Sequence, residues 1–165
     1  MPLKALMLAV LGGLALGVVG CDSNNNVAYV AIQNDFNNPD MTYQPPWTIC
    51  EASYGGVDFG TIDIGTTSAE QEVTAGLDYV YMVAAWDDPT CDPAHALPLA
   101  TPNEEEVVPG QHRTIAINMA NHQGPCPPEG VQPMAEAQYE HIRTLWPQYN
   151  FQPYADRTLN PQCTQ

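Results

Sequence analysis

The chain has 165 residues, enough for one domain of ordinary size with a buried core. It carries 19 acidic residues against 4 basic ones, for a net charge of −15 at neutral pH. A surface of this sign repels phosphate backbones and anionic lipid headgroups, which argues against nucleic-acid binding. The charge is expected mainly to keep the protein soluble in an exposed or salty setting; the alternative is that it attracts cations or basic partners.

The N-terminus has the residue order of a secretory signal peptide. Residues 1–4 end in Lys4, the only lysine of the chain, and residues 5–19 are almost entirely Leu, Ala, Val, Met and Gly. This apolar run is shorter than the roughly 20 residues that a membrane-spanning helix needs. We therefore expect residues 1–20 to be a cleaved signal peptide and the remaining protein to be exported.

Residues 18–21, Val-Val-Gly-Cys, end the apolar run in a single cysteine at the expected cleavage position. The segment resembles the lipobox of bacterial lipoproteins, although that family more often has Leu at the position of Val18. The resemblance implies that Cys21 becomes the N-terminal residue and carries acyl chains. These would anchor the protein to the bacterial cell envelope, on the exported side of the inner or the outer membrane. The alternative is an ordinary signal peptide followed by a chance cysteine.

A short polar tether, residues 22–26, follows Cys21 and reads Asp-Ser-Asn-Asn-Asn. At about 3.3 Å per residue it spans less than about 20 Å when fully extended. The folded domain is therefore expected to lie close to the membrane. Cleavage also removes Lys4, so the mature chain keeps only its three arginines, Arg113, Arg143 and Arg157, against all of the acidic residues.

Four cysteines remain once Cys21 is assigned to lipid, at positions 50, 91, 126 and 163. An even number in an exported domain predicts two disulfides, and four cysteines allow three pairings. We favour Cys50 with Cys91, which would tie an early strand to the loop after the central strand. Cys126 with Cys163 would then close the C-terminal segment onto the sheet region. If Thr48, Cys50 and Ala52 face the core, the first bridge is buried.

Short β-forming segments separated by Gly, Pro, Asn and Asp turns follow the tether. The expected strands are residues 27–33, 47–53, 57–64, 70–74, 77–86, 97–100, 104–108 and 113–119. Residues 77–86 are apolar on both faces, which is typical of a central strand covered by other structure. A spacing of about 8–12 residues predicts a mainly β fold, an antiparallel β-sandwich of about seven or eight strands over residues 27–120.

Turn motifs within residues 49–119 point to a family. They are Phe-Gly at 59–60 with a glycine at 65, Thr-Ala-Gly at 74–76, and Pro-Gly at 109–110 with a threonine at 114. This pattern resembles uncharacterised bacterial cell-envelope domains with an immunoglobulin-like or transthyretin-like sandwich. The chain has Gly-Gly at 55–56 where that family usually has Asp-Gly, and its cysteines are additions. The resemblance implies an envelope module that lacks an active site.

The C-terminal part, residues 121–165, is expected to pack on the same domain. A Pro-rich and Gly-rich connection leads to Pro133, which suits the first turn of a helix over residues 134–146. The tail after this helix is expected to lie over the sandwich, pinned by Cys163. The helix residues expected to pack on the sandwich recur at helical spacing and are Ala135, Tyr139, Ile142 and Trp146.

The acidic loop after the central strand is the best candidate for a metal site. Asp87, Asp88 and Asp92 offer three carboxylates within six residues, and Ca²⁺ prefers such oxygen ligands. The loop lacks EF-hand spacing, and Asp also occurs in turns for its own backbone hydrogen bonds, so a structural role is the alternative. The large aromatic residues could line a carbohydrate or partner surface, with packing as the alternative; they are Trp47, Tyr54, Trp86 and Trp146.

No catalytic motif is present in the sequence. The mature chain has serines only at 23, 53 and 68, none within Gly-x-Ser-x-Gly, and its histidines form no His-x-His or His-Glu-x-x-His. We therefore expect no enzymatic activity and no cofactor apart from the calcium ion considered above.

The expected function is that of a lipid-anchored cell-envelope protein acting as a structural or protein-interaction module. The alternative is a periplasmic or surface binding protein for Ca²⁺ or a small ligand. The expected partners are the membrane, through the anchor, and envelope proteins or cationic molecules.

Overall fold

The structure is a computed structural model that describes residues 26–36, 47–86, 88–118, 121–126, 133–160 and 163. The predicted signal peptide, the lipidation site Cys21 and tether residues 22–25 lie outside the described residues. So do Asp87 and residues 127–132 of the Pro-rich connection. The expectations for these residues stay predictions.

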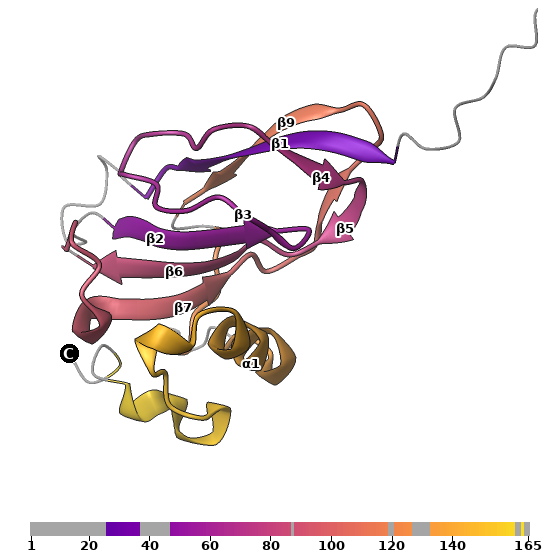
Figure 1. Cartoon of the computed structure of the whole chain (residues 1–165). Helices are drawn as coiled ribbons and strands as arrows, with labels where there is room; N and C mark the ends of the chain where they lie inside the picture. The colour runs from indigo at the N-terminus through magenta and orange to yellow at the C-terminus, as the bar shows by residue number, and fades with distance from the viewer. Residues whose placement is uncertain are drawn as a thin grey trace, which may run out of the picture.

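Nine strands form three sheets within the described residues (Figure 1). In the first sheet, β1 (Val27–Asn34) lies between β4 (Gln71–Thr74) and β9 (His112–Ile117). Strand β1 is antiparallel to β4 but parallel to β9. The first and the last strand of the sandwich are therefore neighbours.

The second sheet is antiparallel throughout and has the order β3-β2-β6-β7. Its strands are β2 (Trp47–Tyr54), β3 (Val57–Asp58), β6 (Tyr81–Trp86) and β7 (Ala96–Ala100). A small third sheet pairs β5 (Gly76–Asp78) with β8 (Glu105–Val107). It lies at the end of the sandwich where the chain enters β1 (Figure 1). A hydrogen bond fixes this position: the N–H of Ala75, just before β5, donates to the carbonyl of Asn26, just before β1, at 2.8 Å.

The main core lies between the two larger sheets. Val30 and Ile32 of β1 point into it from one side and Met82 of β6 from the other, with the period of two that a strand imposes. Tyr54, at the end of β2, is also buried in this core. Its hydroxyl donates to the carbonyl of Glu105 at 2.7 Å, which joins the second sheet to the third.

A buried asparagine at the end of β1 connects the two larger sheets. The side-chain amide of Asn34 donates to the carbonyls of Trp47 and Ile62, each at 2.9 Å. Its Oδ1 accepts the N–H of Phe36 at 3.2 Å. Because both ends of the side chain have partners, a polar residue is accommodated in the interior at this position.

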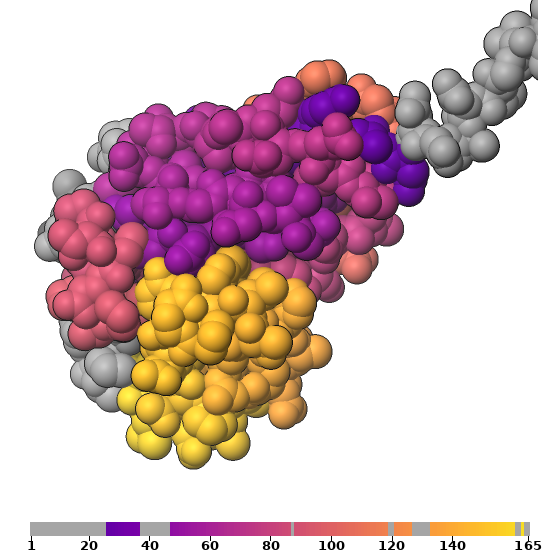
Figure 2. All heavy atoms as spheres, in the orientation of Figure 1, coloured from indigo at the N-terminus to yellow at the C-terminus, as the bar shows by residue number. Residues whose placement is uncertain are grey.

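A third layer, made by the C-terminal segment, covers the outer face of the second sheet (Figure 1, Figure 2). It contains the helix α1 (Glu136–Leu145) and the short 3-10 helices η2 (Pro147–Tyr149) and η3 (Tyr154–Leu159). Val83 and Ala85 of β6 face this layer, in a second apolar cluster with Tyr139 and Ile142 of α1. Strand β6 is thus buried on both faces, as its apolar composition predicts.

Helix α1 presents one apolar face to the sheet and ends at a hydrophobic residue. Tyr139, Ile142 and Trp146 are buried there, as expected. Ala135 is exposed, contrary to expectation, because the helix begins only at Glu136 and leaves Ala135 at its N-cap.

An ion pair on α1 also fastens the tail to the helix. Arg143 pairs with Glu140, and its Nε donates to the carbonyl of Phe151 at 3.0 Å. The other carboxylate oxygen of Glu140 accepts the N–H of Tyr154 at 2.9 Å. The ion pair within the helix therefore also holds the chain that follows it.

The predicted fold class is confirmed, with three differences in detail. Of the strand predicted over residues 57–64, only Val57–Asp58 forms, as β3. The chain is mainly β, with packed sheets, a C-terminal helix and two disulfides. The sandwich is not antiparallel throughout, since β1 and β9 are parallel.

The strand predicted over residues 77–86 is divided into β5 and β6. Between them, the N–H of Val80 donates to the Thr101 hydroxyl at 3.1 Å, which directs the chain from the third sheet into the second. Leu77 is consequently 60% exposed.

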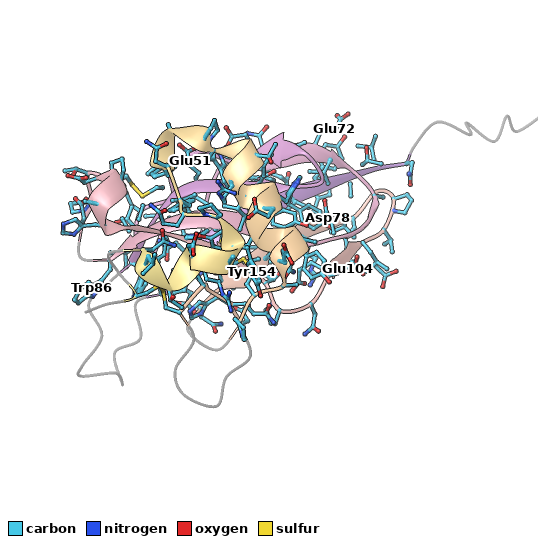
Figure 3. All side chains as sticks on the ribbon, turned by 90° about the horizontal axis from the view of Figure 1, so that it is seen from below. Glu51, Glu72, Asp78, Trp86, Glu104 and Tyr154 are labelled. Atoms are coloured by element: carbon cyan, nitrogen blue, oxygen red, sulfur yellow. A yellow bond between two sulfur atoms is a disulfide. The ribbon has the colours of Figure 1, made fainter. Side chains whose placement is uncertain are left out.

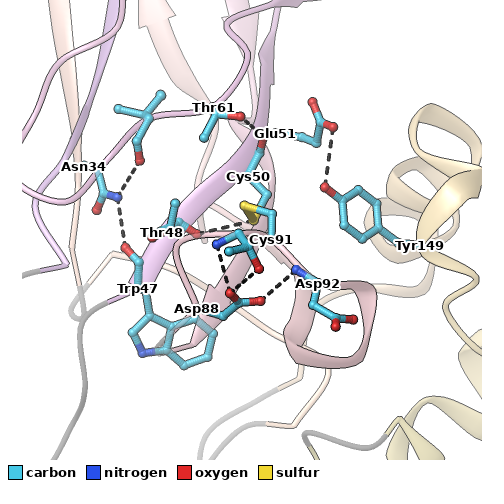
Figure 4. Close-up of a disulfide and its surroundings, with 12 residues drawn as sticks. Asn34, Trp47, Thr48, Cys50, Glu51, Thr61, Asp88, Cys91, Asp92 and Tyr149 are labelled. Atoms are coloured by element: carbon cyan, nitrogen blue, oxygen red, sulfur yellow. Dashed lines mark hydrogen bonds between the residues drawn. A yellow bond between two sulfur atoms is a disulfide. The ribbon is translucent and has the colours of Figure 1, made fainter.

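The structure joins Cys50 to Cys91 and Cys126 to Cys163, the pairs favoured from the sequence. Cys50 lies at a bulge in β2, where the pairing with β6 shifts between Ile49 and Glu51 (Figure 4). The bulge places Cys50 in the second apolar cluster, between β6 and α1, which we call the helix-side cluster. Ala52 lies in the main core. The expectation that these two residues share a face is wrong, because one extra residue reverses the alternation.

Candidate functional site

The predicted calcium ligands that the structure describes are occupied by local hydrogen bonds. One carboxylate oxygen of Asp88 accepts the N–H and the hydroxyl of Thr90, at 2.8 and 2.6 Å, and the other accepts the N–H of Asp92 at 2.7 Å (Figure 4). These bonds, led by that of the Thr90 hydroxyl, lower the pKa of Asp88. Asp92 in turn accepts the N–H of Ala94 and so caps the short helix η1 (Pro93–His95).

These contacts give Asp88 and Asp92 a structural role in the turn that carries Cys91. No group of three or more His, Cys, Asp or Glu side chains suited to a metal is found in the part of the chain that the structure describes. Since Asp87 lies outside that part, calcium binding by Asp87, Asp88 and Asp92 stays a prediction.

The large aromatic residues considered as a binding surface do not gather in one place. Tyr54 and Trp146 are buried, in the main core and in the helix-side cluster respectively. Trp47 and Trp86 are partners across β2 and β6, at the far end of these strands from Tyr54 and Tyr81. Packing therefore accounts for Tyr54 and Trp146.

A pocket that the sequence did not predict lies between the second sheet and helix α1. Its volume is about 640 Å³. Two tyrosines form one wall, Tyr79 from the link between β5 and β6 and Tyr81 from the start of β6. Gln138 and His141, one helical turn apart on α1, line it from the helix side, and the ring of His141 contacts that of Tyr81. Further lining comes from Pro102, Gln123 and Pro133. We call this the aromatic pocket.

Three rings of the aromatic pocket are tilted against one another. The ring centres of Tyr79 and Tyr81 are 6.0 Å apart with an angle of 52° between the planes. Those of Tyr81 and His141 are 4.5 Å apart with an angle of 57°. Successive tilts of this size make a folded wall rather than a flat stack, so ring faces and edges are both presented to a ligand.

Two carboxylates lie near the Tyr81 hydroxyl in the aromatic pocket. Burial raises the pKa of the Tyr81 hydroxyl, and the nearby carboxylate of Asp78, the Tyr79 hydroxyl and the carboxylate of Glu104 raise it further. Figure 3 shows Asp78 and Glu104 on the same side of helix α1. Asp78 is held in place, since its two oxygens accept the N–H groups of Tyr79 at 2.8 Å and Gly55 at 3.1 Å.

The arginines are engaged elsewhere and none lines the aromatic pocket. Arg113 pairs with Glu105, and Arg143 with Glu140. Arg157 lies over the ring of Tyr154, with its guanidinium carbon 4.1 Å from the ring centre. The pocket thus offers aromatic rings, hydroxyl and amide groups, with the carboxylates of Asp78 and Glu104 nearby. These groups suit the binding of a ligand better than nucleophilic chemistry.

The remaining histidines do not converge with the pocket. His112 contacts Glu70 across the outer edge of the first sheet, with Nδ1 3.0 Å from the carboxylate. His122 is largely buried and contacts the carbonyl of Asn118 at 3.0 Å, and burial lowers its pKa. His95 is exposed on η1.

Two ionisable side chains, Glu51 of β2 and Tyr149 of η2, also lie in contact. The hydroxyl of Tyr149 and the amide of Gln148 each lie 3.5 Å from one carboxylate oxygen of Glu51. Burial raises the pKa of Glu51, and the carboxylate of Asp58 adds to the rise. Burial, with a further contribution from Glu51, raises the pKa of Tyr149 to about 12.

Replacing Glu51 by glutamine should stabilise the protein at neutral pH. A raised carboxyl pKa means that the folded state favours the neutral form of Glu51. The stability gained from the neutral form is present below about pH 4.5, and it is lost as the pH rises through the pKa of the folded state. Discounted for solvent screening, the expected gain for Glu51→Gln at pH 7 is about 0.5 kcal/mol. Urea unfolding at pH 7 and pH 4 should show the gain at the higher pH only.

The matched control for that experiment is Glu72→Gln, at an exposed glutamate of β4. It removes the same charge from a strongly acidic protein and so reports the general relief of repulsion. An equal gain from both substitutions would show that the surroundings of Glu51 contribute nothing.

Comparison with family models, with curated proteins and with solved structures finds no match to this chain. No helix in the described ranges is long and apolar enough to cross a membrane. The function must therefore be argued from the sequence and from the pocket itself.

Proposed function

We propose that this chain is a lipid-anchored protein of the bacterial cell envelope whose single domain binds a small ligand and does not transform it. The observation that carries the proposal is the aromatic pocket, a recess with a folded ring wall and several amide and hydroxyl groups. Such a combination of apolar walls with a few polar groups is typical of small-molecule sites. It favours the binding-protein alternative over a purely structural module.

The proposed location rests on the N-terminal sequence and is supported by the disulfides. Both disulfides belong to an exported protein, because the reducing cytosol keeps most cysteines as thiols. The distance between the predicted anchor and the fold is short: β1 already begins at Val27, six residues after Cys21. An anchored chain of this kind would hold the end of the sandwich that carries β5 and β8 toward the membrane.

Mass spectrometry of the mature protein tests the anchor. The expected result is an N-terminal peptide that begins at Cys21 and carries the mass of a diacylglycerol and a further acyl chain. Replacing Cys21 with serine should release the protein from the membrane fraction. An unmodified Cys21, or a mature chain with another N-terminus, would refute the lipoprotein assignment.

Nuclear magnetic resonance with a small-molecule panel tests ligand binding. The probes are choline, N-acetylglucosamine, L-arginine and L-proline, each titrated into the purified protein. The expected result is a saturable change in the amide signals of Tyr79, Tyr81 and His141 with at least one probe. Weak binding corresponds to a dissociation constant of about 1 mM. If no compound perturbs these signals at ligand concentrations up to about 20 mM, the binding function is wrong.

A further inference from the structure

The rings of the aromatic pocket are suited to hold a positive charge. The face of a tyrosine ring carries negative quadrupole charge and attracts a cation within about 6 Å of its centre. Tyr79 and Tyr81 both line the recess and have ring centres 6.0 Å apart, so one cation held between them lies within this distance of both centres. His141 limits the recess on the other side of Tyr81, with ring centres 4.5 Å apart.

The charges around the rings act in the same direction. Asp78 is fixed beside Tyr79 by its bond to the Tyr79 N–H, and Glu104 lies on the same side of α1 (Figure 3). Within the described residues, no arginine lines the recess to neutralise these carboxylates. The acidic surface of the whole chain further raises the local concentration of cations.

The groups that line the recess distinguish between kinds of cation. A metal ion such as Ca²⁺ takes six to eight oxygen ligands, many from carboxylates. Here the lining consists of tyrosine and histidine rings, glutamine amides, prolines and alanines, and neither Asp78 nor Glu104 is part of it. A recess of about 640 Å³ also greatly exceeds the size of a bare ion. A large organic cation with diffuse charge fits both features.

We infer that the aromatic pocket binds the quaternary ammonium group of a small organic cation over the faces of Tyr79 and Tyr81, with Asp78 and Glu104 stabilising its charge. This inference rests on the proposed binding function and names its ligand class. The amides of Gln123 and Gln138 supply hydrogen bonds to a polar group elsewhere on the ligand.

A pair of probes that differ in charge but hardly in shape tests the inference. Choline carries a trimethylammonium group, and 3,3-dimethylbutan-1-ol carries an uncharged tert-butyl group of the same size. Isothermal titration calorimetry on the full mature protein in detergent should show choline binding at least about tenfold more tightly, the effect of roughly 1.4 kcal/mol from the ring and carboxylate interactions.

Substitutions at Tyr81 separate the ring from the hydroxyl. Tyr81→Phe keeps the ring face and should change choline affinity by less than about threefold, whereas Tyr81→Leu should weaken it about tenfold. Asp78→Asn should weaken choline but not the alcohol. Tyr29→Leu is the matched control, because Tyr29 also stacks on a histidine, His112 at 4.6 Å, but lies on β1 away from the pocket. The unfolding midpoint of each variant shows whether it has folded.

The outcomes separate this inference from the proposed function. Equal binding of choline and the alcohol, or unchanged choline binding by folded Tyr81→Leu, overturns the cation assignment. If N-acetylglucosamine or proline perturbs Tyr79 and Tyr81 while choline does not, the cation assignment falls and the binding function stands. If none of the panel binds, both fall.

Discussion

Replacing both Cys50 and Cys91 with alanine should lower the free energy of unfolding by about 4 kcal/mol. The bridge closes a loop of 41 residues, and in the chain-entropy model a loop of this size accounts for nearly all of that loss. Cys50 is only 2% exposed, packed in the helix-side cluster, so its truncation also leaves a small cavity. Urea unfolding of the double variant, followed by circular dichroism under non-reducing conditions, measures the change.

The second disulfide is the control for this prediction. It closes a loop of 37 residues, so loss of Cys126 and Cys163 removes almost the same chain entropy. Neither cysteine is fully buried. The double alanine variant at Cys126 and Cys163 should therefore be the less destabilised of the two. A larger loss at this bridge than at Cys50–Cys91 would contradict the role assigned to the buried packing of Cys50.

Replacing Tyr139 with alanine should cost about 3–5 kcal/mol, the usual range for truncating a buried aromatic residue. Its side chain is completely buried between α1 and the second sheet. Its hydroxyl donates to the carbonyl of Gln152 and accepts from the amide of Asn160, both at 2.9 Å. One side chain therefore joins the sheet, the helix and the tail. Urea unfolding of the variant and of the parent protein measures the loss.

Tyr139→Phe separates the hydroxyl from the ring. The substitution leaves the ring packed but removes the hydrogen-bond partner of two polar groups, the Gln152 carbonyl and the Asn160 amide. This loss should cost about 1–2 kcal/mol. The same experiment tests whether residues 121–165 fold with the sandwich, because tryptophan fluorescence and circular dichroism should then report coincident transitions. A separate early transition in the parent protein would show that the C-terminal layer is an independent unit.

Strand positions could be predicted because they depend on local sequence. The Val30 and Ile32 alternation in β1 and the apolar faces of residues 81–86 are visible without knowing any partner. The bulge at Cys50 and the break at Val80 could not be predicted in this way. The first depends on the pairing of β2 with β6, and the second on a hydrogen bond from Thr101, a residue of a different segment.

The aromatic pocket was missed for a similar reason. Tyr79 and Tyr81 alternate along one face of an expected strand and His141 lies in an expected helix, but nothing local indicates that these rings meet. They meet because α1 packs across β6, a contact between segments about 60 residues apart. The aspartates of the loop after β6 were conspicuous in the sequence, yet Asp88 and Asp92 mainly bond to their own turn.

The parallel pairing of β1 with β9 has a consequence for the timing of folding. The first strand of the chain cannot complete its sheet until the segment His112–Ile117 has been made. Chains with many such distant pairings fold slowly, in about milliseconds to seconds. For an exported chain this delay is useful, because a polypeptide that cannot close early stays extended enough to be threaded across a membrane. Under the export proposed above, the order of the strands would keep the protein ready for transport until it reaches the compartment in which its disulfides form.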